Sequence, residues 1–222
     1  MTRKILLSII IVVILSFSAC ELNSDVIYTG DDNNNYIIVR DENGNITIND
    51  NGKLQVYTLN ENNKKQKSDS GEYITKFIDF NGQVVIDNTV ETAELTFTLP
   101  DKFIADKDNV GYFYCESYDA EIFFNYYNED IQTNIDSIIH NCENLLESFG
   151  SENFKYEQYS VVIDGDECTA FKHKSTSSEY YRNAYYYIIP YDTGYYEINC
   201  IINTDDANKV NFDKFVQTIN IK

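Results

Sequence analysis

Several residue types are scarce in this 222-residue chain, which has no tryptophan, two prolines, one methionine, two histidines and nine glycines. Proline cannot donate a hydrogen bond to a β-ladder, so its scarcity leaves predicted strands uninterrupted. With two histidines, a cysteine–histidine pair is the only route to an activated thiol nucleophile. The sequence contains no Gly-x-Ser-x-Gly motif, no His-Glu-x-x-His motif and no phosphate-binding glycine loop. It therefore carries no common catalytic signature.

Positive charge is scarce as well. The chain has 17 lysines and arginines against 36 aspartates and glutamates, which gives a net charge of -19 at pH 7. Such a chain is repelled by polyanions, and no basic run longer than Lys64-Lys65 interrupts the negative field. We therefore exclude nucleic acid as a partner, and we expect anionic lipid headgroups and wall phosphate polymers to be poor partners.

The first twenty residues have the layout of a secretory signal. A basic head of Arg3 and Lys4 precedes an almost wholly apolar run over 5–17, and Ser18-Ala19-Cys20 ends the segment. The apolar run has about 13 residues, whereas a helix needs roughly 20 to span a bilayer. A plain transmembrane anchor is therefore the weaker alternative.

The end of this segment resembles the lipobox of bacterial lipoproteins, in which an aliphatic residue and two small residues precede an invariant cysteine. Phe17 stands where leucine is usual. The resemblance implies cleavage before Cys20 and diacylation of that cysteine. A lipid on Cys20 would hold the protein on the membrane, at the outer face of the cytoplasmic membrane of a bacterium. The mature chain would carry a net charge of about -21, because Arg3 and Lys4 are lost with the signal peptide.

Composition divides the chain into a signal peptide (1–19), a polar segment rich in asparagine and aspartate (20–69) and a domain of ordinary size (70–222). The polar segment contains two similar turns, Asp41-Glu42-Asn43-Gly44 and Asn49-Asp50-Asn51-Gly52. Because Asn-Gly favours tight hairpin turns, 36–39, 46–48 and 54–59 can form a thin meander. The preferred interpretation is a flexible tether, and the meander is left open.

Residues 70–222 show strand patterns and one clear helix. Apolar residues at helical spacing predict a helix over 130–149, capped near Asp130 and ended by Gly150. A shorter helix is predicted over 206–217, and Asn81-Gly82 predicts a hairpin between 73–80 and 83–86. Further strands are predicted at 94–99, 110–117, 121–127, 156–163, 168–174, 180–189 and 195–202. This order predicts an α+β fold, an antiparallel sheet flanked by one long and one short helix.

The order of elements after residue 91, together with several local phrases, resembles the Mog1/PsbP-like group of exported proteins. The phrases are Leu95-Thr96-Phe97-Thr98-Leu99-Pro100, Tyr195-Tyr196-Glu197-Ile198 and a Phe-x-x-Phe-x-x-x-Ile ending over 212–219. The resemblance covers 91–222 and implies a central antiparallel sheet flanked by helices that serves in binding or assembly. It supplies no site residues.

Four cysteines remain besides Cys20, namely Cys115, Cys142, Cys168 and Cys200. Their apolar neighbours favour buried thiols, and disulfides in any of three pairings are left open.

The remaining polar candidates do not predict a catalytic or metal site. His140 is expected at the edge of the long helix, and His173, between two lysines, is expected to face solvent. Acidic turns such as Asp164-x-Asp166 offer oxygen ligands for Ca²⁺, but none matches the twelve-residue calcium loop. Solvated turns are therefore expected, with no cofactor, no metal site and no catalytic residue.

Aromatic residues are the strongest functional signal, with 19 tyrosines and 13 phenylalanines. They occur on both faces of the predicted strands, and the helices can cover only part of one face. Tyrosine also gives large contact area at low entropic cost. The alternative is that these rings simply cover the sheet. The candidate ligand-binding residues are Tyr114, Tyr126, Tyr181, Tyr185, Tyr187 and Tyr195.

These features predict a membrane-anchored, exported lipoprotein whose single domain is a non-catalytic binding or envelope-assembly module. Its expected partner is a protein, peptide or glycan of the envelope. The alternative is a small secreted hydrolase that acts at the cell surface, which a cluster of His173, Cys168 and an acidic residue in one cleft would favour.

Overall fold

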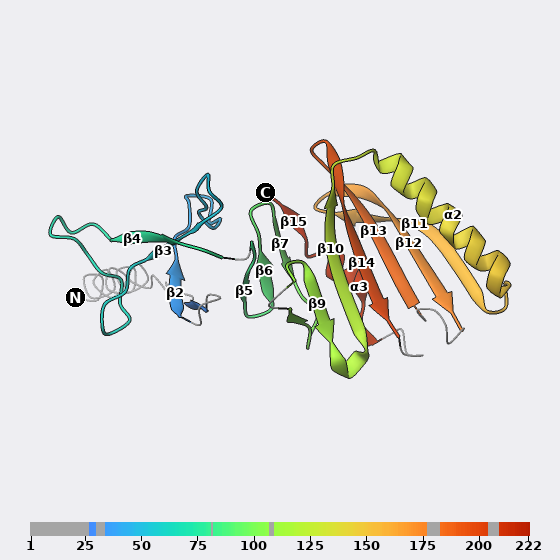
Figure 1. Ribbon diagram of the computed structural model, residues 1–222, viewed down its shortest axis with the longest axis horizontal. Coiled ribbons are helices and arrows are strands. Elements are labelled where there is room, and N and C mark those ends of the chain that lie inside the picture. Colours follow the sequence, from blue (N-terminus) through green and yellow to red (C-terminus); the bar gives the residue numbers. More distant parts are fainter. Residues whose placement is uncertain (1–26, 30–33, 81, 107–108, 177–182, 204–208) are drawn as a thin grey trace, which may run out of the picture.

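The computed structural model describes residues 27–29, 34–80, 82–106, 109–176, 183–203 and 209–222. This part of the chain forms three antiparallel sheets, which follow one another along the long axis of the molecule (Figure 1). None of the helices in these ranges combines the length and the apolar character that crossing a bilayer requires.

The first sheet has the strand order β1-β2-β3-β4. Its strands are β1 (Ile27–Thr29), β2 (Asn35–Ile38), β3 (Leu54–Tyr57) and β4 (Thr75–Ile78). Leu54 and Val56 are fully buried, because the same face of β3 packs in a small core with Val84 of the next sheet. Strands β1, β2 and β3 lie in the segment 20–69, for which a flexible tether was the preferred prediction and a meander the alternative, and β4 lies just after it.

A structural repeat of 19 residues connects the strands of this sheet. The backbone N–H of Val39 donates to the carbonyl oxygen of Gln55, that of Gln55 to Thr47, and that of Thr47 back to Val39. These three hydrogen bonds, of 2.8–3.1 Å, close a ring. The same ring of three hydrogen bonds recurs between Thr58, Gln66 and Ile74. Both copies therefore have the same backbone path.

Each copy contains two five-residue turns, and three of these four turns are closed by an Asx side chain. Oδ1 of Asp41 accepts hydrogen bonds from the backbone N–H groups of Asn43 and Asn45, both at 2.9 Å. Asn49 and Asn60 make the same pair of bonds to the residues two and four positions ahead. This is the Asx-turn, in which the side chain replaces a backbone acceptor.

The two copies differ in what they bury. Ile46 and Leu54 of the first copy are buried in the small core, whereas the equivalent positions of the second copy carry Lys65 and Tyr73. Tyr73 is 51% exposed. Of the two copies, only the first therefore contributes buried side chains at these positions to the small core.

The second sheet has the order β15-β7-β6-β5. It contains β5 (Val84–Ile86), β6 (Thr89–Glu91), β7 (Leu95–Thr98) and β15 (Asn220–Ile221), so the end of the chain pairs with a strand from its middle.

The third sheet has the order β11-β12-β13-β14-β10-β9-β8. A short 3-10 helix, η1 (Glu116–Tyr118), joins two of its strands. Its strands are β8 (Ile104–Ala105), β9 (Tyr112–Cys115), β10 (Ala120–Tyr127), β11 (Phe154–Ile163), β12 (Asp166–Ser175), β13 (Asn183–Tyr191) and β14 (Gly194–Ile202).

The predicted long helix is confirmed as α2 (Ile131–Phe149). Asp130 caps its start by accepting a hydrogen bond from the N–H of Thr133, and Gly150 at φ 77° ends it. The second helix, α3 (Phe212–Val216), has five residues, and part of the predicted helix over 206–217 lies outside the described residues.

The main core lies between the second and third sheets. β7 contributes Phe97, α3 inserts Phe212 and Phe215, and the facing side of the third sheet contributes Phe113 and Tyr187. All four cysteines besides Cys20 are buried free thiols, as their apolar neighbours predicted.

The predicted α+β class is wrong. Strands make up 48% and helices 16% of the structure, and α2 is the one helix of seven or more residues in the described chain. Two causes explain the error. The polar segment expected to be a tether contributes strands, and the inner face of the large sheet packs against a second sheet and not against a long helix.

The hairpin predicted at Asn81-Gly82 is also wrong. The strands on either side of it belong to different sheets, because β4 pairs with β3 and β5 pairs with β6. The real hairpin turns at Asp87 and Asn88, whose φ angles of 49° and 25° fit a tight turn. Asn81 itself lies outside the described residues.

Candidate functional site

A cleft opens where the second sheet meets the third. Its volume is about 420 Å³, within the range of ordinary ligand pockets. We call it the tyrosine cleft, and it is lined by Gly82, Gln83, Thr92, Glu94, Leu95, Phe97, Val110, Gly111, Phe113, Phe124, Tyr126, Tyr191 and Tyr196.

Three tyrosines from three strands stand together in this cleft. Tyr126 of β10 and Tyr196 of β14 are direct cross-strand partners, and Tyr191 lies at the end of β13. Their ring centroids are 5.1–6.1 Å apart, and the ring planes meet at 46–82°. Tyr126 remains 44% exposed. The three rings thus form angled walls that a ligand can reach.

Phenylalanines form an apolar base beside these rings. Phe97 and Phe124 stack with centroids 4.4 Å apart and planes at 10°. Phe113 meets Phe97 edge-on at 5.6 Å. Because this group belongs to the main core, the base of the cleft is fixed by packing.

The connection between β6 and β7 carries Glu94, the single charged residue among the described lining residues. The hydroxyl oxygen of Thr92 accepts hydrogen bonds from the N–H groups of Glu94 and Leu95, at 3.3 and 3.0 Å. The backbone N–H of Lys222 donates to the carbonyl oxygen of Glu94 at 2.9 Å. The backbone of Glu94 is therefore held from both sides.

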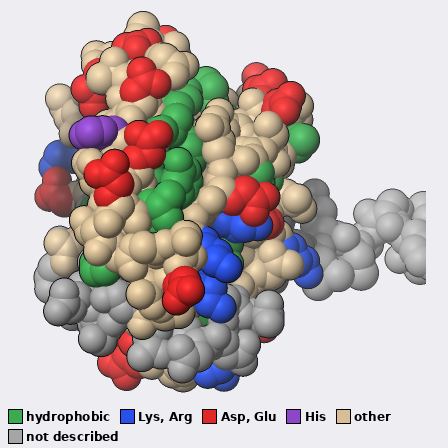
Figure 2. All heavy atoms as spheres, turned by 90° about the vertical axis from the view of Figure 1, so that its right-hand side faces the viewer, with side chains coloured by type: hydrophobic (Ala, Val, Ile, Leu, Met, Phe, Trp, Pro, Cys, Tyr) green, Lys and Arg blue, Asp and Glu red, His purple; other side chains and the backbone are tan. Residues whose placement is uncertain are grey.

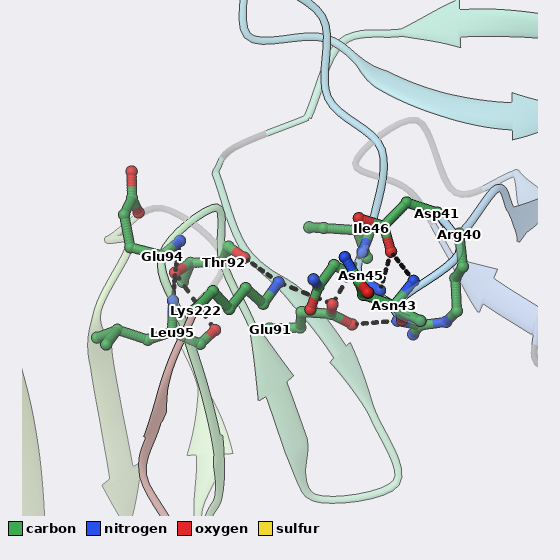
Figure 3. A network of polar contacts seen from close by, with 11 residues as sticks. Arg40, Asp41, Asn43, Asn45, Ile46, Glu91, Thr92, Glu94, Leu95 and Lys222 are labelled. Atoms are coloured by element: carbon green, nitrogen blue, oxygen red, sulfur yellow. Dashed lines mark hydrogen bonds and ion pairs between the residues drawn. The ribbon is translucent and has the colours of Figure 1, made fainter. Parts of the chain in front are cut away.

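The side chain of Glu94 is not part of the ion-pair network next to it. Figure 3 shows its carboxylate pointing away from Arg40 and Lys222, which both bind the carboxylate of Glu91. Burial raises the pKa of Tyr191 and of Tyr196, and the nearby Glu94 carboxylate adds to both shifts. Both phenols therefore stay neutral at physiological pH, beside a negative charge.

The sequence candidates take different positions. Tyr126 lines the cleft, whereas Tyr114 alternates with the inward-facing Phe113 and so lies on the opposite face of the sheet. Tyr187 and Tyr195 are fully buried, and Tyr185 packs on Phe212 at 5.3 Å. Tyr181 lies outside the described residues.

Sequence reasoning missed Tyr191, Tyr196 and Glu94. The sequence did contain a signal for the position of Tyr196. The alternation in β14 places its side chain on the same face as Ile198 and Cys200, the face that points towards the second sheet. Nothing local marked Glu94, because its role depends on strands that are distant in sequence.

A second, smaller pocket of about 250 Å³ lies between α2 and the strands β12 and β13. Cys142 and His173 both line it. The prediction that His173 faces solvent is wrong, because its ring lies under α2, 5.2 Å from Phe154, and is 4% exposed. His140, in contrast, is exposed on α2.

The chemistry of this second pocket does not resemble an activated nucleophile. Burial raises the pKa of the Cys142 thiol to about 11, so the thiol is protonated at neutral pH, whereas a reactive cysteine needs a lowered pKa. Cys168 belongs to the main core on the other side of the sheet. No group of three or more potential metal ligands occurs among the described residues.

The outer face of the sheet around α2 is partly apolar. Figure 2 shows a strip of hydrophobic side chains bordered by acidic ones on this side of the molecule. The helix keeps several apolar residues half-buried, namely Ile131, Ile138, Ile139, Leu145, Leu146 and Phe149.

The chain matches no protein-family model and no curated protein.

Proposed function

We propose that the protein is an exported lipoprotein, anchored through a lipid on Cys20, whose folded part is a non-catalytic binding module. The single observation that carries the binding role is the tyrosine cleft. It combines an adequate volume, a rigid apolar base and three accessible phenol rings. Clefts with this lining bind ligands by apolar contact, and a few polar groups set the orientation.

The anchor is supported by the sequence. The basic head, the short apolar run and Ser18-Ala19-Cys20 fit a lipoprotein signal. A Cys20→Ser variant should be released from the membrane fraction, and mass spectrometry of the wild-type N-terminal peptide should detect the acyl chains.

The hydrolase alternative receives little support. Cys168 and His173 lie on opposite faces of the third sheet, and the thiol next to His173, that of Cys142, has a raised pKa. A thiol hydrolase built on either pair would need the opposite electrostatics.

The binding role is tested by a thermal-shift screen of residues 20–222 carrying Cys20→Ser, against envelope glycans and short peptides. A ligand present at 100 times its Kd stabilises by about 2.7 kcal/mol, which raises the Tm of a chain this size by roughly 5–10 °C.

Variants assign such a shift to the cleft. A double variant, Tyr126→Ala with Tyr196→Ala, should lose most of the shift, whereas Tyr114→Ala, on the opposite face of the same sheet, should retain it. A shift that survives the double variant and disappears in Tyr114→Ala would place the site elsewhere.

A further inference from the structure

The tyrosine cleft contains a feature that a purely apolar site does not need. Glu94 lines the same cleft as the three tyrosines and places a carboxylate near Tyr191 and Tyr196, and among the described residues no lysine or arginine forms an ion pair with it. The two cationic side chains near Glu94, those of Lys222 and Arg40, form ion pairs with Glu91. Nζ of Lys222 lies 2.9 Å from Glu91 and donates to the carbonyl oxygen of Thr92, while Arg40 binds the other oxygen of Glu91.

Other tyrosines of this protein already make cation–π contacts, in which a lysine ammonium group lies over the ring. Lysine Nζ atoms lie 4.4–5.8 Å from the ring centroids of Tyr36, Tyr57, Tyr73, Tyr118 and Tyr159. Such placement is favourable because the face of an aromatic ring carries negative charge density. Within the described chain, no such cation lies over the three cleft tyrosines.

We infer that the cleft recognises a lysine side chain of a peptide or protein partner, with the ammonium group held by the three tyrosines and Glu94. This inference rests on the proposed binding role of the cleft. It specifies the chemistry of the ligand.

The shape of the cleft matches both parts of a lysine side chain. Lysine has an apolar four-carbon stem and a charged head. The stacked pair of Phe97 and Phe124 offers an apolar surface for the stem. The rings of Tyr126, Tyr191 and Tyr196 pack against one another and together offer a continuous aromatic surface for the head, in the same cleft as the Glu94 carboxylate. The volume of about 420 Å³ exceeds the need of an ammonium ion alone and accommodates the stem with adjacent backbone.

The charge of the whole chain favours the same ligand. A net charge of -19 attracts cationic segments and repels anionic ones, and this attraction raises the rate of encounter. Lysine is therefore preferred to a carboxylate or phosphate ligand of similar size.

The test uses residues 20–222 carrying Cys20→Ser and two pools of acetylated hexapeptide amides. One pool has lysine fixed at the third position, and the other has norleucine, which keeps the stem and lacks the charge. Bound peptides are separated by size exclusion and counted by mass spectrometry. We expect the lysine pool to be retained about tenfold more, the scale of a cation–π contact with a partly desolvated ring.

Two variants assign the preference to the cleft. Glu94→Gln keeps the shape and removes the charge, so the ratio of lysine to norleucine retention should fall towards one. Glu143→Gln, an exposed residue of α2, makes the same change in net charge and should leave the ratio unchanged. Tyr196→Phe keeps the ring and should also retain the preference.

The possible outcomes distinguish a failure of the lysine preference from a failure of the binding role of the cleft. Equal retention of both pools would overturn the lysine inference and leave the cleft as an apolar binding site. An equal loss of preference in Glu94→Gln and Glu143→Gln would reduce it to a general charge effect and overturn it as well. Retention of neither pool would overturn the lysine inference together with a peptide-binding role for the cleft.

Discussion

Gly111 illustrates how the cleft depends on single residues. Its φ angle is +77°, and a Cβ atom there would lie 2.9 Å from the carbonyl oxygen of Phe124. Its N–H donates to Oε1 of Gln83 at 3.1 Å, and its carbonyl oxygen accepts from the N–H of Phe124 at 2.8 Å. Glycine therefore permits both a left-handed conformation and the close approach that joins one wall of the cleft to its base.

We expect Gly111→Ala to lower the free energy of unfolding by roughly 1–3 kcal/mol, because strain and a steric clash add. Urea unfolding measures the change. Gly44→Ala is the matched control, since Gly44 has a φ of +87° and nothing within 4 Å of the added Cβ. A loss in Gly111→Ala no larger than in Gly44→Ala would contradict the steric argument.

The residue scale also shows where sequence reasoning stops. Tyr126 and Tyr195 each begin a Tyr-Tyr pair in a strand, yet one is accessible in the cleft and the other has no exposed surface. His173, flanked by two lysines, is buried because α2 lies over its strand. A side chain's exposure on a strand depends on what packs against that face, and this information is not local.

At the scale of elements, Glu91 of β6 joins three parts of the chain. Its carboxylate accepts from Arg40 at 2.7 Å, from the N–H of Ile46 at 3.0 Å and from Lys222 at 2.9 Å (Figure 3). Burial alone would raise the pKa of Glu91, but these hydrogen bonds outweigh it and hold the pKa below the ordinary value of 4.5. The network attaches the first sheet and the C-terminus to the second sheet.

This network predicts a pH dependence of stability. A carboxyl group whose pKa is lowered by folding contributes stability that is complete above its unfolded pKa and is lost as the pH falls through its folded pKa. At about pH 6, Glu91→Gln should therefore cost roughly 1–3 kcal/mol relative to wild type. That difference should shrink towards about pH 3. Chemical denaturation at both pH values, with Glu143→Gln as control, measures it. A difference that is independent of pH would contradict the conclusion that the ionised carboxylate of Glu91 supplies this stability.

The turns show which elements are predictable. Hairpins turn at Asp164-Gly165 and at Asp192, and the strands predicted on either side of each turn do pair with one another. Asn81-Gly82 has an equally strong local signal, yet its flanking strands pair with other partners. The 19-residue repeat is not visible in the hydrophobic pattern for another reason. Lys65 and Tyr73 replace the buried Ile46 and Leu54, so the hydrophobic pattern of the first copy does not recur.

At the scale of the whole molecule, the sequence patterns predicted an antiparallel sheet, but they placed it in an α+β fold and did not predict the division into three sheets. The cleft lies between two of those sheets, and its lining residues range from Gly82 to Tyr196. A site assembled from such distant segments depends on topology, which single-sequence patterns do not encode. The residues that predict the export signal, in contrast, form one contiguous segment. Export, lipidation at Cys20 and the resemblance to the Mog1/PsbP-like group all remain predictions.

We propose that the tyrosine cleft is the surface where the protein meets its partner. Site-specific photocrosslinking in the producing cells tests it most directly, with p-benzoylphenylalanine placed at Tyr126 or, on the opposite face, at Tyr114. We predict a discrete crosslinked product from Tyr126 that is much weaker from Tyr114 and is reduced when Glu94→Gln is added. Products of equal yield at both positions, or a product from Tyr114 alone, would contradict the claim.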